Sequence, residues 1–209
     1  QKPTELNYNV TLPANIPCGV HTLRVLTATG VTQPSIVVVD RLPVVAHSNQ
    51  NKSRESAQSV PAECVVEGHV DNLSRLYFRF PGKAEQSFSI EVQARRLGSA
   101  LDPTVRLFDA NDKEIAWSDD EPGLQGDCYL KTTLPMDGEY TIELSDIRYQ
   151  GSANHRFRLR LGNFALLTTT DPMVVHEKSE TTFSLAGLGL SGPYATQLAP
   201  EAITAAQDQ

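Results

Sequence analysis

The side chains best suited to chemistry in this sequence are acidic, and they lie at turns. Between residues 97 and 140, turn signals recur about every 8 to 12 residues, and short runs of β-branched and aromatic residues separate them. The turns are Asp102-Pro103, Asn111-Asp112, Asp119-Asp120 and Asp137-Gly138. Carboxylates on loops either bind a metal ion or are solvated. The turn pattern leaves both interpretations open.

The residue patterns of common hydrolases are missing. No G-x-S-x-G nucleophile motif occurs. His176-Glu177 begins like the zinc motif H-E-x-x-H, but residue 180 is a glutamate, so the second imidazole is absent. The remaining histidines are interpreted as surface or satisfied polar residues: His21, His47, His69 and His155. We therefore expect no catalytic residue and no enzymatic activity in this chain.

Composition narrows the function classes further. The 209 residues are 40% hydrophobic and 21% charged, which is ordinary for a globular protein with a packed core. The net charge of −7 argues against nucleic-acid binding, which depends on Lys and Arg at phosphates. No apolar run reaches the roughly 18 residues of a membrane span. The chain begins with neither Met nor a signal peptide, so we expect a segment of a longer polypeptide whose export signal lies upstream.

The three cysteines do not form a recognisable motif. Cys18, Cys64 and Cys128 are far apart, without the C-x-x-C spacing of zinc or redox sites. An odd number cannot pair completely, although one disulfide remains open. The favoured interpretation is buried free thiols that act as small hydrophobic side chains.

The elements that must hold these turns are strands. From Pro61 to Phe164, apolar residues alternate with polar ones, which gives each strand one buried and one exposed face. The predicted core residues are Leu76, Phe78, Phe80, Phe88, Ile90, Val92, Ala94, Tyr140, Ile142, Leu144, Phe157, Leu159 and Leu161. The outward neighbours, rich in Arg and Glu, suit a solvent-exposed sheet. About seven to nine strands in this segment predict an all-β fold, an antiparallel β-sandwich or jelly roll.

Shorter β segments flank this predicted sandwich. Residues 1–45 predict a partial β segment, beginning with Leu6, Tyr8, Val10 and Leu12 on one face. Residues 46–60 hold no large apolar cluster and predict a linker, or a loop that lies over the next domain. Residues 165–194 are expected to begin a further β segment. Residues 195–209 are expected to be a disordered tail.

The middle segment resembles the bacterial pre-peptidase C-terminal domain, a jelly-roll-like sandwich attached to many secreted proteases. The residues that carry the resemblance are Val66 to Val70, Leu76 to Phe80, Gly98 to Pro103, Trp117 to Asp120, Leu134 to Tyr140 and Phe157 to Leu159. The flanking segments resemble immunoglobulin-like strands of the IPT/TIG type. The resemblance implies an accessory, non-catalytic role in an exported protein. It also implies similarity to collagen-binding or polysaccharide-binding modules.

Some members of that family bind calcium through acidic linker and turn residues. In this chain the acidic linker is replaced by residues 46–51, and Leu76 stands where the family often has Asp. The carboxylates left for calcium are Asp102, Asp119, Asp120 and Asp127, with Asn49 and Asn51 as further oxygen donors. The alternative is that Asp119 and Asp120 are turn residues that bind their own backbone. No other cofactor is expected.

The sequence thus predicts a spacer, or a module that binds an extracellular polymer or the cell surface weakly. Aromatic residues and Arg dominate binding surfaces, so the predicted ligand-binding residues are Tyr77, Arg79, Trp117, Tyr129 and Tyr149. The expected partners are neighbouring domains of the parent polypeptide and an extracellular polysaccharide or protein. The expected location is extracellular, periplasmic or the cell surface. The rival hypotheses are a secreted hydrolase with its catalytic domain elsewhere and a calcium-stabilised binding module.

Overall fold

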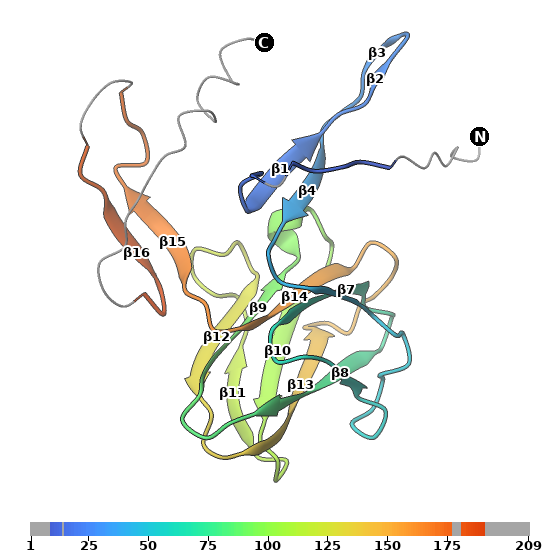
Figure 1. Cartoon of the computed structure of the whole chain (residues 1–209). Coiled ribbons are helices and arrows are strands. Elements are labelled where there is room, and N and C mark those ends of the chain that lie inside the picture. The colour runs from blue at the N-terminus through green and yellow to red at the C-terminus, as the bar shows by residue number, and fades with distance from the viewer. Residues whose placement is uncertain (1–8, 14, 177–180, 191–209) are drawn as a thin grey trace. The chain divides into compact units, whose positions relative to one another are not determined.

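The computed structural model describes residues 9–13, 15–176 and 181–190, and the regular secondary structure among them is almost entirely β-strand (Figure 1). Two five-stranded sheets pack face to face as a sandwich. The predicted all-β sandwich is therefore confirmed. The one helical element in the described part of the chain is a 3₁₀ turn, η1 (Arg95–Leu97).

Each sheet is assembled from strands that are far apart in sequence. The first sheet has the order β11-β10-β13-β8-β6, with bounds β11 (Glu114–Ser118), β10 (Pro103–Phe108), β13 (Gly138–Asp146), β8 (Arg75–Gly82) and β6 (Gln58–Ser59). The second has the order β12-β9-β14-β7-β5, with bounds β12 (Cys128–Thr133), β9 (Ser87–Gln93), β14 (Arg156–Gly162), β7 (Cys64–His69) and β5 (Val44–Ala46).

The core lies between the two sheets and contains every residue that the alternation predicts. Phe78 and Phe80 of β8 are fully buried, as are Phe88 and Ile90 of β9. The Phe80 ring stacks on Phe88, with ring centroids 4.3 Å apart, and so joins the two sheets. Burial of each large apolar side chain contributes roughly 1.5 to 3 kcal/mol. The period-two pattern is therefore what positions the strands.

The edges of both sheets depart from a purely antiparallel arrangement. β5 pairs in parallel with β7, and β6 pairs in parallel with β8, whereas the inner pairs are antiparallel. Residues 47–57 connect these two short edge strands. Asn51 in this connection is fully buried, and its side chain donates a hydrogen bond to the Tyr77 carbonyl at 2.8 Å. This contact holds the connection against the sandwich.

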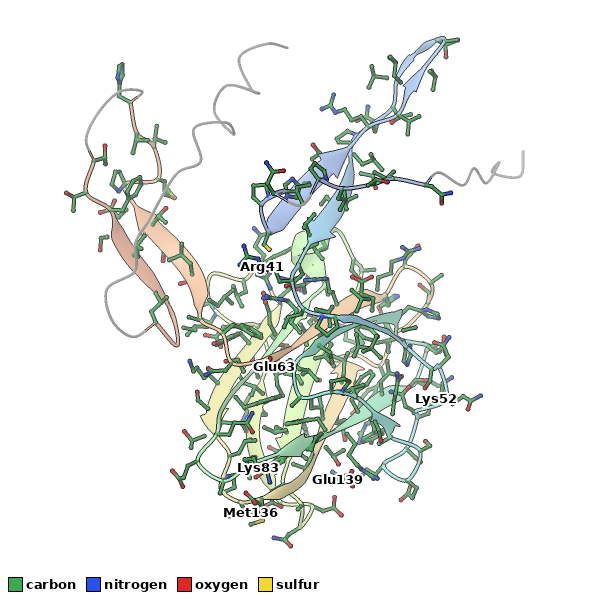
Figure 2. The ribbon with its side chains drawn as sticks, in the orientation of Figure 1. Arg41, Lys52, Glu63, Lys83, Met136 and Glu139 are labelled. Atoms are coloured by element: carbon green, nitrogen blue, oxygen red, sulfur yellow. The ribbon has the colours of Figure 1, made fainter. Side chains whose placement is uncertain are left out.

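A tyrosine corner closes one end of the first sheet. The Tyr140 hydroxyl donates to the Met136 carbonyl at 2.7 Å and accepts from the Met136 N–H at 3.2 Å. These two hydrogen bonds tie the start of β13 to the turn before it. Figure 2 shows Lys83, Met136 and Glu139 at this end of the sandwich.

The outward faces correct one expectation. The charged residues of β9 and β14 were predicted to be exposed, but Glu91 is fully buried and Arg158 is 5% exposed. They are covered because they take part in a network of ion pairs that reaches Asp40. The cysteines agree with the prediction in part: Cys64 and Cys128 are buried free thiols, whereas Cys18 is free and exposed.

Short hairpins flank the sandwich. β1 (Gly19–Leu23) pairs with β4 (Ser35–Val39), and β2 (Leu26–Thr27) pairs with β3 (Gly30–Val31). The strand predicted at the start of the chain is not formed in its described part, since Val10 and Leu12 are exposed and irregular; Leu6 and Tyr8 lie outside the described residues.

A separate compact unit begins after the sandwich. The chain divides between Asn163 and Phe164, and the second unit holds the pair β15 (Leu166–Asp171) and β16 (Ser184–Leu188). The tail predicted for residues 195–209 lies outside the described residues. Across the described part of the chain, no helix has both the length and the apolar character needed to span a membrane.

Candidate functional site

Asp127, a predicted calcium ligand, is a fully buried anchor for the turn that follows β9. Its carboxylate accepts hydrogen bonds from the backbone N–H groups of Ala94 at 3.1 Å, Arg95 at 2.7 Å and Arg96 at 3.4 Å. It also accepts one from the Arg96 Nε at 2.7 Å. A carboxylate with this many donors is fully engaged, and its position explains the 3₁₀ turn at Arg95–Leu97.

The other three predicted ligands lie at the same end of the sandwich. Asp102 accepts a hydrogen bond from Arg95 Nη1 at 3.0 Å. Asp119 has one buried oxygen, Oδ1, for which the described residues supply no hydrogen-bond donor. Burial raises the pKa of the Asp119 carboxyl, and the nearby charges of Asp120 and Asp102 raise this pKa further. The acidic turns therefore come together, but arginines lie among them.

These residues do not fit a calcium ion. Calcium takes six to eight oxygen ligands, and several of them are carboxylates. Asp102 and Asp127 are occupied by Arg95 and Arg96. The Asn51 amide is occupied too, because its oxygen accepts from His47 Nε2 at 2.6 Å and its nitrogen donates to Tyr77. Among the residues that the structure describes, no three His, Cys, Asp or Glu side chains are grouped so as to hold a metal ion.

The structure separates the five predicted ligand-binding residues into two groups. Tyr77 and Tyr129 are 8% and 3% exposed, so they do not offer an aromatic face to a ligand. The Arg79 guanidinium donates to the Arg54 carbonyl at 3.0 Å, in the connection between β5 and β6. Trp117 and Tyr149 are 64% and 40% exposed. Only this exposed pair retains the surface that the prediction assumed.

Trp117 belongs to a row of side chains that crosses the outer face of the first sheet. Strand register places Trp117 of β11 opposite Arg106 of β10, and Arg106 opposite Glu143 of β13. A recess of about 100 Å³ lies along this row, and Trp117, Arg106, Glu143, Asp119, Thr104 and Tyr149 are among the residues that line it. The row combines an aromatic face, hydrogen-bond donors and carboxylate acceptors within one small surface.

A second charged cluster, on the outer face of the other sheet, was missed from the sequence. Arg160 of β14 donates to Glu91 at 2.6 Å and to Asp40 at 2.7 Å, and Arg158 donates to Asp40 at 2.8 Å. Burial raises the pKa of Asp40, but hydrogen bonds from Arg158 and Arg160 outweigh it and hold that pKa at about 2. The alternation Arg158-Leu159-Arg160 opposite Glu91 is the signal that could have identified this cluster. Its contacts are structural, because the acids and bases neutralise one another.

Comparison with known proteins gives a partial match. No protein-family model matches the chain. The chain is similar to a probable subtilase-type serine protease of Deinococcus radiodurans, with 39% identity over 70 residues. These residues are 33% of this chain and 9% of that protease, so the chain corresponds to a small part of the relative.

Two solved structures each cover 51% of the chain. One is the pre-peptidase C-terminal domain of a collagenase from Bacillus anthracis, with 12% identity, a TM-score of 0.40 and 94% of that domain covered. It is a domain of the family that the sequence resembles. The other is a periplasmic inhibitor of g-type lysozyme from Aeromonas hydrophila, with 17% identity, a TM-score of 0.38 and 97% of that chain covered.

Proposed function

We propose that this chain is a non-catalytic accessory β-sandwich module of a larger exported bacterial polypeptide. The observation that carries the proposal is the curated match, because the matched segment makes up 9% of a protein described as a probable subtilase-type serine protease. In that relative the segment is one part of a much longer chain. The module would accordingly act outside the cytoplasm, in the periplasm, at the cell surface or in the medium.

Within the larger polypeptide the module would serve as a spacer and as a weak attachment site for an extracellular polymer or protein. The packed core supports the spacer role, since a sandwich with buried aromatic contacts between its sheets resists deformation. The exposed Trp117 and Tyr149 support the attachment role. Trp and Tyr are the residue types that contribute most to binding surfaces.

A second candidate function is an accessory role in proteolysis, with the catalytic domain elsewhere in the polypeptide. The similarity to a probable serine protease favours it. The module would then position the enzyme on its substrate rather than take part in peptide cleavage. The attachment surface would be the same in both cases, so the two proposals differ in what the neighbouring domain does.

The purified chain tests this proposal directly. We expect no hydrolysis of casein, of gelatin or of nitrophenyl esters, because the chain would contain no active site. Pull-down on insoluble collagen, chitin and cell-wall preparations would reveal the attachment role, and failure to bind any of them would leave the spacer role alone. Hydrolysis that a single Ser, Cys or His substitution abolishes would contradict the proposal.

A further inference from the structure

The outer face of the first sheet presents two largely exposed side chains, Trp117 of β11 and Arg106 of β10. The inward residues of β10 and β13, such as Leu107 and Ile142, are fully buried in the core. Their alternate neighbours Arg106 and Glu143 therefore point away from the core, and Trp117 lies beside Arg106 on the edge strand β11. The indole has no packing role that explains it, since Trp117 is 64% exposed.

The recess beside Trp117 is too small to enclose a separate small molecule. Its volume is about 100 Å³, whereas pockets for small ligands are commonly about 300 to 1,000 Å³. A larger ligand that crosses the face could still place one ring substituent in it. The floor is hydroxylic, because Thr104 Oγ1 and Ser145 Oγ lie 3.0 Å apart there.

The charges around the recess disfavour an ionic ligand of either sign. An anion would meet Glu143 and Asp119, and a cation would meet Arg106 and Arg75. The ion pairs that these residues make are long, at 3.6 Å for Arg75 to Glu143 and 3.6 Å for Arg106 to Glu114. The guanidinium of Arg106 is largely exposed and so remains able to donate to a ligand.

A protein partner also fits this face poorly. Stable protein interfaces bury roughly 1,200 to 2,000 Å² in total, and the centre of the buried patch is apolar. On this row the exposed apolar surface of Trp117 is interrupted by Arg106 and the recessed carboxyl of Glu143. The remaining ligand type is neutral and rich in hydroxyl groups, because each hydroxyl both donates and accepts a hydrogen bond.

We infer that this face binds a strand of neutral polysaccharide, with one sugar ring stacked on the Trp117 indole and its hydroxyls bonded to Arg106. The inference rests on the proposed attachment role and names the ligand class and the residues for it. Tyr149 also lines the recess, and Arg75 donates to its hydroxyl at 2.7 Å.

Native affinity electrophoresis in gels that contain hydroxyethylcellulose, laminarin, dextran or arabinoxylan tests this inference. We expect at least one of these neutral polysaccharides to retard the wild-type chain. The Trp117→Ala variant should bind at least tenfold more weakly, and Trp117→Phe should recover part of the affinity. Leu26→Ala is the matched control, because Leu26 is 79% exposed but lies on β2, outside this face. Its affinity should equal that of the wild type.

The outcomes separate this inference from the proposed function. Absence of retardation in all four gels, or retardation that Trp117→Ala leaves unchanged, overturns the polysaccharide site. Retention by collagen alone also overturns it, while the accessory attachment role then survives. Hydrolytic activity would contradict the accessory role without affecting the binding result. Melting curves of the variants confirm folding, which is expected because the substituted side chain is exposed.

Discussion

The sequence predicts a surface or satisfied polar role for His47, but its Nδ1 is buried, and the described residues supply no hydrogen-bond partner for it. Its ring packs against both Phe78 and Phe157, with ring centroids 5.9 Å and 5.6 Å away. Burial lowers the pKa of His47 below 6.5, the Asn51 hydrogen bond and Asp71 oppose this shift, and His69 and Lys52 add to it. The ring also excludes any side chain at residue 68, because a Cβ on Gly68 would lie 2.6 Å from His47 Nδ1.

The lowered pKa of His47 predicts loss of stability in mild acid. Between the folded-state pKa and 6.5, the unfolded chain binds more protons than the folded chain, so the free energy of unfolding falls as the pH falls. His47 therefore contributes fully above about pH 6.5. We expect the melting temperature of the wild type to fall more between pH 7.5 and 5.5 than that of His47→Gln.

The matched control is His155→Gln, because the His155 ring contacts the exposed Ser152 hydroxyl rather than the core. This variant should retain the wild-type dependence on pH. If His47→Gln and the wild type lose melting temperature in parallel, protonation of His47 is not the cause.

At the scale of elements, Asp40 joins the segment before β5 to β14. Its carboxylate Oδ2 accepts from Arg158 and Arg160, and Asp40 and Arg158 are both largely buried. Replacement by Asn removes the charge that these two guanidiniums share. Arg158 retains its hydrogen bonds to Glu67 and Gln93, and Arg160 retains its hydrogen bond to Glu91, so the loss of stability is limited. We expect Asp40→Asn to lower the free energy of unfolding by about 2 kcal/mol in urea titrations.

The pair Lys52–Asp71 offers a control of similar distance but different burial. Its nitrogen and oxygen are 2.7 Å apart, with side chains 47% and 45% exposed, and Figure 2 shows Lys52 projecting from the connection between β5 and β6. Exposed pairs contribute about 0 to 1 kcal/mol, so Asp71→Asn should cost less than Asp40→Asn. Equal losses in the two variants would show that burial does not determine the contribution of Asp40.

The same elements show which features a sequence can predict. The inner strands are predictable because alternation is a local property, so Phe78 and Ile142 could be placed in the core without knowing their partners. Asp40 and Arg158 are 118 residues apart, and no local pattern links them. The sequence predicts exposed positions for Tyr77 and Tyr129, because alternation indicates on which face of a sheet a side chain lies. It does not indicate which other residues cover that face. The short strands β5 and β6 lack a pattern of sufficient length.

At the scale of the whole molecule, two arginines of the chain balance the carboxylates that gather at the end of the sandwich near Asp102 and Asp127. Arg95 and Arg96 lie in one 3₁₀ turn, which the buried carboxylate of Asp127 fixes in place. This turn directs Arg95 to Asp102 and Arg96 to both Asp127 and Glu91. The two guanidinium groups thereby reduce the electrostatic cost of bringing these carboxylates together.

This arrangement predicts that calcium does not stabilise the module. A ligand that binds only the folded state raises stability by about 2.7 kcal/mol at a hundred times its Kd, so a functional calcium site would raise the melting temperature clearly. We expect the melting temperature of the wild type to be the same in EDTA, in millimolar magnesium and in millimolar calcium. A calcium-specific rise that Asp119→Asn abolishes would contradict this and restore the calcium-stabilised hypothesis. Arg95→Gln sharpens the comparison, because it frees Asp102 near Asp119, and any response to calcium should then be greater in this variant than in the wild type.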